Sequence, residues 1–275
     1  MIVVTYPDRS ESYPSAEECG ELIRDVPILN KVSVNSTDPS AGSDSIAWYK
    51  PIDLNAEEHA PPYRYQLSRK SSVNAEFEVV YTSDPSDDIL ALDTVVVDPS
   101  LNTEELQHTY RVELLSGPEA SSVGKSRDAS SIFLTSTPSD NTLTLTWNVD
   151  VPWENQEYIL YKYKSHPDST DVLFELARTS ESFYVDENLA NLKPYKYLLK
   201  SVGRYSSDQL NDTLINWSQL HVGIPEDNEA PCSPPSQLIV GDCNLDEASI
   251  TWSNPNNACE DVDDVLEARL DADLG

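Results

Sequence analysis

The stretch TLTLTWNVD (142–150), followed after a short polar turn by EYILYKYK (157–164), decides the fold. Apolar and polar residues alternate along both segments, which is typical of strands with one buried face. Threonine, valine and tyrosine are enriched in such strands. Alternation in the second segment divides the side chains between two faces and leaves open which face is inside: Tyr158, Leu160 and Lys162, or Ile159, Tyr161 and Tyr163.

The tryptophan that closes the first of these strands recurs along the chain. Trp48 in SIAWYKP, Trp147 in TLTLTWNVD and Trp252 in ASITWSNP each close a short alternating run. They are spaced by about 100 residues, the size of one β-sandwich domain. A tyrosine-rich segment and a longer apolar segment follow in the same order in two of the copies, at 63–70 and 108–117 and again at 157–164 and 195–204.

Four segments follow from this repeat and from composition. We expect residues 1–25 to be the tail of a preceding domain or a linker, 26–127 and 128–226 to be complete sandwiches, and 227–275 to be a truncated third domain. The last segment has only two recognisable strands, whereas a sandwich needs about seven. It ends in the acidic run 260–275, the best helical stretch of the sequence, where we expect fraying or a loose helix.

The two complete copies resemble fibronectin type III domains. The resemblance rests on the tryptophan of the second strand, the tyrosine-rich third strand, and Leu189 six residues before Tyr195, which in that family form the corner before the sixth strand. It implies an all-β fold of tandem fibronectin type III-like, immunoglobulin-like β-sandwiches. The expected structural core is Trp48, Trp147, Tyr110, Tyr161, Leu189 and Tyr195.

The first copy departs from this pattern at the corner. Its leucine is Leu101, and His108 stands where the second copy has Tyr195. A histidine has no phenolic hydroxyl, so the hydrogen bond of a corner tyrosine is not expected there.

A narrower resemblance concerns the C-terminal part. DNEAPCSPP (227–235) and ITWSNPNNAC (250–259) are similar to the closing domains of exported proteins of gliding bacteria, which carry a gliding-motility-associated, type IX secretion C-terminal sorting region. The sorting region itself is missing from this sequence. The resemblance implies an extracellular or cell-surface protein and no catalytic residue. The beginning (1–12) lacks the basic and apolar parts of a signal peptide, so we expect an internal or truncated piece of a longer chain.

Charge limits the partners that this chain can bind. It has 275 residues, 48 acidic and 18 basic, and a net charge of −30. Such a surface repels phosphate, so neither nucleic acid nor anionic membrane is an expected partner. No apolar run reaches the ~20 residues that span a bilayer. Only 8 glycines are present, and no phosphate-binding glycine motif occurs.

The residues that carry catalysis or bind metals are scattered. His59, His108, His166 and His221 stand in no zinc-binding context, and no nucleophile elbow occurs. The acidic segment 242–247 lacks the glycine and the final glutamate of an EF-hand loop. We therefore expect no catalytic residue, no cofactor and no tightly bound metal.

The four cysteines are candidates for disulfide bonds, because their spacing does not suit zinc. Three pairings of four cysteines are possible, and the sequence does not choose among them or exclude reduced thiols. The candidates are Cys19, Cys232, Cys243 and Cys259.

The sequence thus predicts a non-catalytic spacer or adhesion-type module array, whose partners are other domains of the same parent protein. The alternative is an accessory region of a larger extracellular enzyme that binds a surface glycan or a protein. A row of two or three solvent-exposed aromatic side chains on one sheet face distinguishes the alternative, since a spacer does not need it.

Overall fold

The computed structural model describes residues 25–72, 74–166, 169–207 and 209–228, together with strands at 238–242 and 247–251. The described residues contain one short 3₁₀ helix, η1 (Ile89–Ala91), and no α-helix. They divide into two compact units. The first holds residues up to Ser136, Leu145–Tyr184 and Tyr195–Gly223; the second holds Thr137–Thr144, Val185–Pro194 and residues from Ile224 onward.

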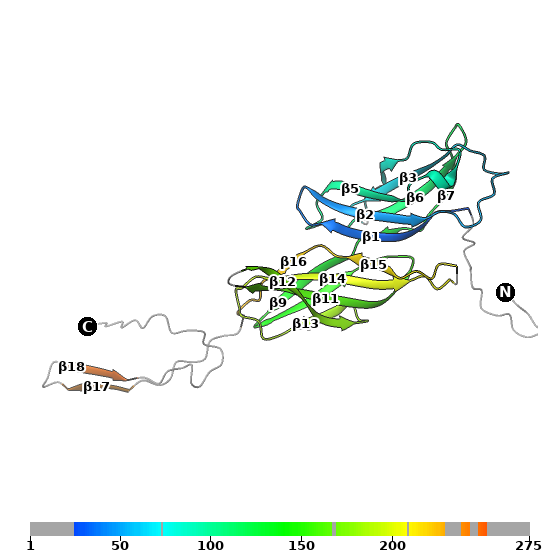
Figure 1. The fold of residues 1–275 in the computed structure, drawn as a ribbon. Coiled ribbons are helices and arrows are strands. Elements are labelled where there is room, and N and C mark those ends of the chain that lie inside the picture. Colours follow the sequence, from blue (N-terminus) through cyan, green and yellow to red (C-terminus); the bar gives the residue numbers. More distant parts are fainter. Residues whose placement is uncertain are drawn as a thin grey trace, which may run out of the picture. The chain divides into compact units, whose positions relative to one another are not determined.

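The first sandwich has two antiparallel layers (Figure 1). One sheet has the order β1-β2-β5 and the other β4-β3-β6-β7, with β8 also pairing with β6. The strands are β1 (Ile28–Ser36), β2 (Gly42–Tyr49), β3 (Tyr63–Lys70), β4 (Glu78–Thr82), β5 (Val95–Leu101), β6 (Thr109–Ser116), β7 (Ser121–Lys125) and β8 (Ala129–Ser130).

The second sandwich repeats this order. Its sheets are β13-β10-β9 and β12-β11-β14-β15, with β16 also pairing with β14. The strands are β9 (Phe133–Ser139), β10 (Thr142–Asn148), β11 (Glu154–His166), β12 (Ser169–Thr179), β13 (Phe183–Asp186), β14 (Tyr195–Arg204), β15 (Leu214–Trp217) and β16 (His221–Gly223).

This strand order confirms the predicted fold class. In both copies, the first, second and fifth strands form one sheet, and the third, fourth, sixth and seventh form the other. The chain is all-β, and it contains tandem fibronectin type III-like β-sandwiches. A further antiparallel pair, β17 (Leu238–Asp242) and β18 (Glu247–Thr251), lies in the segment expected to be a truncated third domain.

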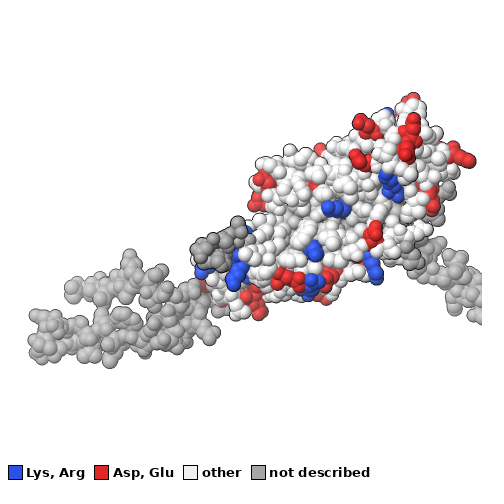
Figure 2. Space-filling model, viewed as in Figure 1, with Lys and Arg blue, Asp and Glu red and all other residues white. Residues whose placement is uncertain are grey.

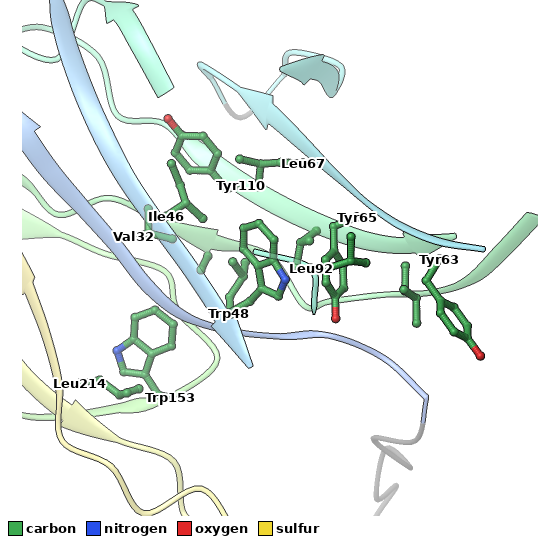
Figure 3. Close-up of a cluster of buried hydrophobic side chains, with 14 residues drawn as sticks. Val32, Ile46, Trp48, Tyr63, Tyr65, Leu67, Leu92, Tyr110, Trp153 and Leu214 are labelled. Atoms are coloured by element: carbon green, nitrogen blue, oxygen red, sulfur yellow. The ribbon is translucent and has the colours of Figure 1, made fainter. Parts of the chain in front are cut away.

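A tryptophan against a tyrosine lies at the centre of each sandwich. The ring centroids of Trp48 and Tyr65 are 5.3 Å apart at 71°, and those of Trp147 and Tyr158 are 5.3 Å apart at 60°. This edge-to-face arrangement is the favoured one for aromatic pairs. Figure 3 shows Trp48 among the aliphatic and tyrosine side chains of the first core. Burying a tryptophan of this kind covers about 150–250 Å².

Within the second compact unit, backbone and side-chain hydrogen bonds hold the corner that contains Leu189. Leu189 N donates to Asn141 O at 2.9 Å, and Asn191 Nδ2 donates to Asp140 Oδ1 at 2.7 Å. Leu189 itself is buried. These two hydrogen bonds hold the turn around Leu189 that precedes β14.

Several sequence predictions lie outside the described residues. They concern Trp252, the helical stretch at 260–275, and all four cysteines: Cys19, Cys232, Cys243 and Cys259.

Candidate functional site

The residues predicted to form the core do not all occupy it. Trp48, Trp147, Tyr110 and Leu189 are buried. Tyr195 is only partly buried, with the Lys162 ammonium 4.6 Å from its ring centroid.

Tyr161 lies on the outer face of β11, not in the core. Tyr158 and Leu160 are the inward side chains of this strand, and both are buried. Alternation then directs Tyr161 outward, opposite Leu198 of β14. The sequence left the choice of face open, and the contact of Tyr158 with Trp147 decides it, because both rings must meet between the sheets.

A cluster of polar side chains occupies the first core, where the sequence predicted none. Tyr110 Oη donates to Asp44 Oδ2 at 2.8 Å and lies 3.1 Å from Asp98 Oδ2. Arg69 Nη1 donates to Asp98 Oδ2 at 2.8 Å, while its Nη2 contacts Glu78. His108 Nδ1 lies 3.2 Å from Asp44 Oδ2, within ion-pair distance but out of hydrogen-bond alignment. We call Asp44, Arg69, Asp98, His108 and Tyr110 the buried polar cluster.

The buried polar cluster is closed to substrates. Asp44 and Tyr110 are fully buried, and His108 is 2% exposed. Burial raises the pKa of the Tyr110 hydroxyl far above its ordinary value, and the Asp44 and Asp98 carboxylates raise it further. Among the described residues, no group of three or more His, Cys, Asp or Glu side chains is arranged to hold a metal ion. The cluster therefore satisfies buried charge rather than presenting reactive groups to solvent.

A signal for one member of this cluster is present in the sequence. Asp44 lies two and four residues before Ile46 and Trp48, so alternation places all three on the inner face. The carboxylate was overlooked because Asp is almost never fully buried unless it is paired. Its partner Tyr110 lies on β6 and His108 lies just before β6, both far away in sequence.

The feature that joins the two copies lies in the first compact unit, where β1 meets β15. Val32 N donates to Asn216 Oδ1 at 2.9 Å, and Trp217 N donates to Ser33 Oγ at 2.9 Å. Leu220 N donates to Thr37 Oγ1 at 2.8 Å. Side-chain oxygens thus accept from backbone N–H groups that no strand pairing uses. We call this contact the β1–β15 junction.

The β1–β15 junction has an apolar part as well. Trp153 is 5% exposed and lies in one cluster of buried residues with Leu29 and Leu214. Figure 3 shows Trp153 and Leu214 next to one another. The rings of Trp153 and Tyr205 are 6.0 Å apart at 68°, and Tyr205 Oη donates to Leu29 O at 2.6 Å. Burial raises the pKa of the Tyr205 hydroxyl.

A glycine permits this close packing. A Cβ atom at Gly203 of β14 would lie 2.6 Å from Glu154 O and 2.9 Å from Trp153 Cδ1. Any other residue would force Trp153 or the start of β11 to move. The absence of a side chain at Gly203 therefore lets the indole approach.

The junction also covers exposed sheet edges. β1 is an edge strand of its sheet, and β15 and β16 form an edge of theirs. Unpaired edges are templates for pairing with other chains, and proteins protect them. Gln219 protects a further edge, because its amide accepts from Leu134 N at 3.1 Å and donates to Leu134 O at 2.6 Å.

A groove of about 440 Å³ opens beside the β1–β15 junction, between β1 and β2 on one side and β14 and β15 on the other. Trp217 lines it, and the rings of Trp217 and Tyr161 are 5.4 Å apart on the outer face of their sheet. A second cavity of about 300 Å³ lies at the opposite end of β1, lined by Ile28, Lys125, Tyr205 and Leu210 among others. The sequence predicted neither, because each combines residues of both sandwiches.

Comparisons with known proteins give little beyond this geometry. No protein-family model and no curated protein sequence matches the chain. A similar solved structure is the chicken CNTN1 FN1–FN3 domains, with 14% sequence identity, covering 82% of this chain and 76% of that chain at a TM-score of 0.27. That TM-score is too low to support a fold assignment, which rests instead on the strand order. Within the described residues, no helix has the length and apolar character needed to cross a membrane.

Proposed function

We propose that this chain is a non-catalytic spacer or adhesion-type module array, in which the β1–β15 junction fixes the geometry between consecutive modules. The observation that carries the proposal is the composition of that junction. Hydrogen bonds from backbone N–H groups to Asn216, Ser33 and Thr37 orient β1 relative to β15. The packing of Trp153 on Tyr205 buries apolar surface there. A flexible linker needs neither.

Two properties support a mechanical role over a chemical one. Among the described residues, His, Asp, Arg and Tyr converge in the buried polar cluster, where Asp44, Tyr110 and His108 are buried. The side chains that join the modules are partnered and held, which suits a part that transmits force or keeps a distance. Single exposed ion pairs such as Arg178–Glu175 add little to stability.

We also propose that the protein is exported, on the basis of a sequence resemblance. The segments 227–235 and 250–259 resemble closing domains of exported, gliding-motility-associated bacterial proteins. A net charge of −30 keeps such a surface soluble and monomeric. We place the array outside the cell or at its surface, with other domains of the parent protein as its first partners.

Single-molecule fluorescence energy transfer tests the proposal. Dyes would be attached to Glu119→Cys in the first sandwich and Glu181→Cys in the second, both exposed positions, with the natural cysteines replaced by serine. A fixed spacer gives one narrow distribution of transfer efficiency that is insensitive to ionic strength. A broad distribution, or turnover of an ester, phosphate or glycoside substrate that a point substitution abolishes, would overturn it.

One observation favours the alternative of a glycan-binding accessory region. Trp217 and Tyr161 form an aromatic pair on an outer sheet face beside a groove. The pair is partly exposed, whereas the Trp48–Tyr65 and Trp147–Tyr158 pairs lie in the cores.

A further inference from the structure

The groove beside the β1–β15 junction has one apolar and aromatic wall. Trp217 of β15 and Leu198 of β14 face it from the second sandwich. Tyr161 packs against Trp217 at 5.4 Å and a tilt of 39°, so the indole cannot fold away into solvent. A supported, partly exposed indole is the group that stacks on the C–H face of a sugar ring, where dispersion and the ring quadrupole both contribute.

The opposite wall offers polar groups that the protein does not use. The Lys31 ammonium and the Ser45 hydroxyl, both lining the groove, have no partner among the described residues. Asn35 donates its amide to Ser43 and keeps its carbonyl oxygen for another donor. Thr37 Oγ1 accepts from Leu220 N and retains its proton for donation. Donors and acceptors thus alternate opposite an aromatic wall, as a polyhydroxylated ligand requires.

The charge of the groove differs from that of the chain. No Asp or Glu lines it, although the chain has 48 acidic residues. Lys31 lines the groove, and the Lys200 ammonium lies 5.7 Å from the Trp217 ring centroid. Figure 2 shows acidic side chains mainly toward the edges of the face in view and several Lys or Arg side chains nearer its middle. At physiological ionic strength the Debye length is about 8 Å, so these local cations outweigh distant carboxylates.

Peptide binding by strand addition does not suit this groove. Addition of a strand needs free backbone N–H and C=O groups along a sheet edge. At the bordering edges, Val32 N, Trp217 N and Leu220 N already donate to Asn216, Ser33 and Thr37.

We propose that the groove beside the β1–β15 junction binds an acidic saccharide, with a sugar ring on Trp217 and a carboxylate near Lys31. Its volume of about 440 Å³ lies within the range of small-molecule sites, and sites occur preferentially where two domains meet. The proposal goes beyond the spacer function and does not depend on it. A spacer that also binds an acidic glycan would attach its parent protein to a charged polysaccharide surface.

Isothermal titration of the full chain with a short oligogalacturonate tests this proposal, with a neutral cello-oligosaccharide of the same length as the second probe. We expect saturable binding of the acidic probe only, accompanied by a change in tryptophan fluorescence and weakened by added salt. Absence of binding, or equal binding of the neutral probe, would overturn the proposal. Capture of a strand-forming peptide at the same groove would do so as well.

Three variants locate the site. Trp217→Leu should weaken binding about tenfold by removing the stacking surface, and Lys31→Met should weaken it about fivefold. Ser45→Gln should block the groove from the outer face of β2 without touching a junction hydrogen bond, so it serves if Trp217→Leu disturbs folding. Phe183→Ala and Lys193→Met remove an exposed aromatic and an exposed cation elsewhere and should leave binding unchanged. Unchanged binding in both Lys31→Met and Ser45→Gln would contradict the assignment.

Discussion

The two sandwiches share a strand order and a tryptophan–tyrosine contact, yet their cores differ four residues before the tryptophan. The first sandwich has Asp44 there and the second has Leu143, and both side chains are fully buried. The first core supplies Tyr110 and His108 to the carboxylate, and Arg69 neutralises the neighbouring Asp98. The comparison teaches that alternation and one aromatic contact suffice for this fold, while a buried charge is tolerated only with its partners.

The two sandwiches also correspond at positions near the corner. β3 pairs Arg69 with Tyr110, and β11 pairs Lys162 with Tyr197 at the corresponding place. His108 of the first copy corresponds to Tyr195 of the second. In the second sandwich, Lys162 lies over the rings of Tyr195 and Tyr197. A cation at this corner is therefore common to both copies.

The largest expected effect comes from placing the carboxylate in the wrong core. Leu143→Asp should lower the free energy of unfolding of the second sandwich by about 4–5 kcal/mol, because the charge is buried without the partners of Asp44. Urea denaturation followed by backbone amide signals of each sandwich measures this. Thr144→Asp, directed to the outer face of the same strand, should cost well under 1 kcal/mol. An equal loss in the free energy of unfolding for the two variants would show that the second core tolerates a buried carboxylate.

The reverse test removes the buried charge from the first sandwich, which has partners for it. Asp44→Asn keeps the shape and removes the charge, so Tyr110 loses a charged hydrogen-bond acceptor and His108 loses the neighbouring carboxylate. We expect the first sandwich to lose about 2 kcal/mol, the usual range for a hydrogen bond to a charged group. Asp53→Asn, at an exposed position, is the control and should have no measurable effect. A more stable Asp44→Asn protein would mean that the buried polar cluster is a net cost.

Alkaline pH should act on the same core. Burial raises the pKa values of Tyr65 and Tyr110 above the ordinary tyrosine value of 10.0. Their contribution to stability is complete below pH 10 and is lost above it, because only the unfolded state releases the protons. We expect a slope of about 1.4 kcal/mol per pH unit for each of them.

Urea denaturation at several pH values, within about one unit of the unfolded tyrosine pKa, measures that slope. Tyr110→Phe costs stability at neutral pH but should flatten the loss at high pH, since one ionisable group is gone. An unchanged slope in this variant would show that Tyr110 is not responsible.

The smallest expected effect concerns one hydrogen bond of the β1–β15 junction. Asn216→Ala removes the acceptor of Val32 N, which should cost about 1 kcal/mol. Asn211→Ala, an exposed asparagine nearby in sequence, should cost less than half of that. Thermal unfolding resolves the difference. An Asn216→Ala protein as stable as the wild type would mean that water replaces the amide without loss.

The sequence predicted the parts of this structure that depend on local pattern. Alternation around Trp48 and Trp147, and the spacing between them, were enough for two all-β sandwiches. The position of Tyr161 was not predictable, because alternation alone does not tell an inner from an outer face. Asp44 was overlooked although its spacing from Trp48 places it on the inner face. Its partner Tyr110 lies 66 residues further along the chain, so no local pattern links the two.

The β1–β15 junction and its groove could not be predicted for a related reason. Val32 and Asn216 are separated by 184 residues, and no local pattern links them. Trp153 reads as an ordinary loop residue before β11, and Tyr205 as the end of a strand. Only the folded chain shows that these two rings meet Leu29.

The proposed spacer function requires that the β1–β15 junction hold β1 and β15 in a fixed geometry. Nitrogen-15 relaxation of the full chain, measured separately for β3 and β6 and for β11 and β14, tests it most directly. We expect one rotational correlation time for both sandwiches in the wild type and two different times in Trp153→Ala, which loses the apolar part of the junction. Two different times in the wild type, with no change in Trp153→Ala, would contradict it.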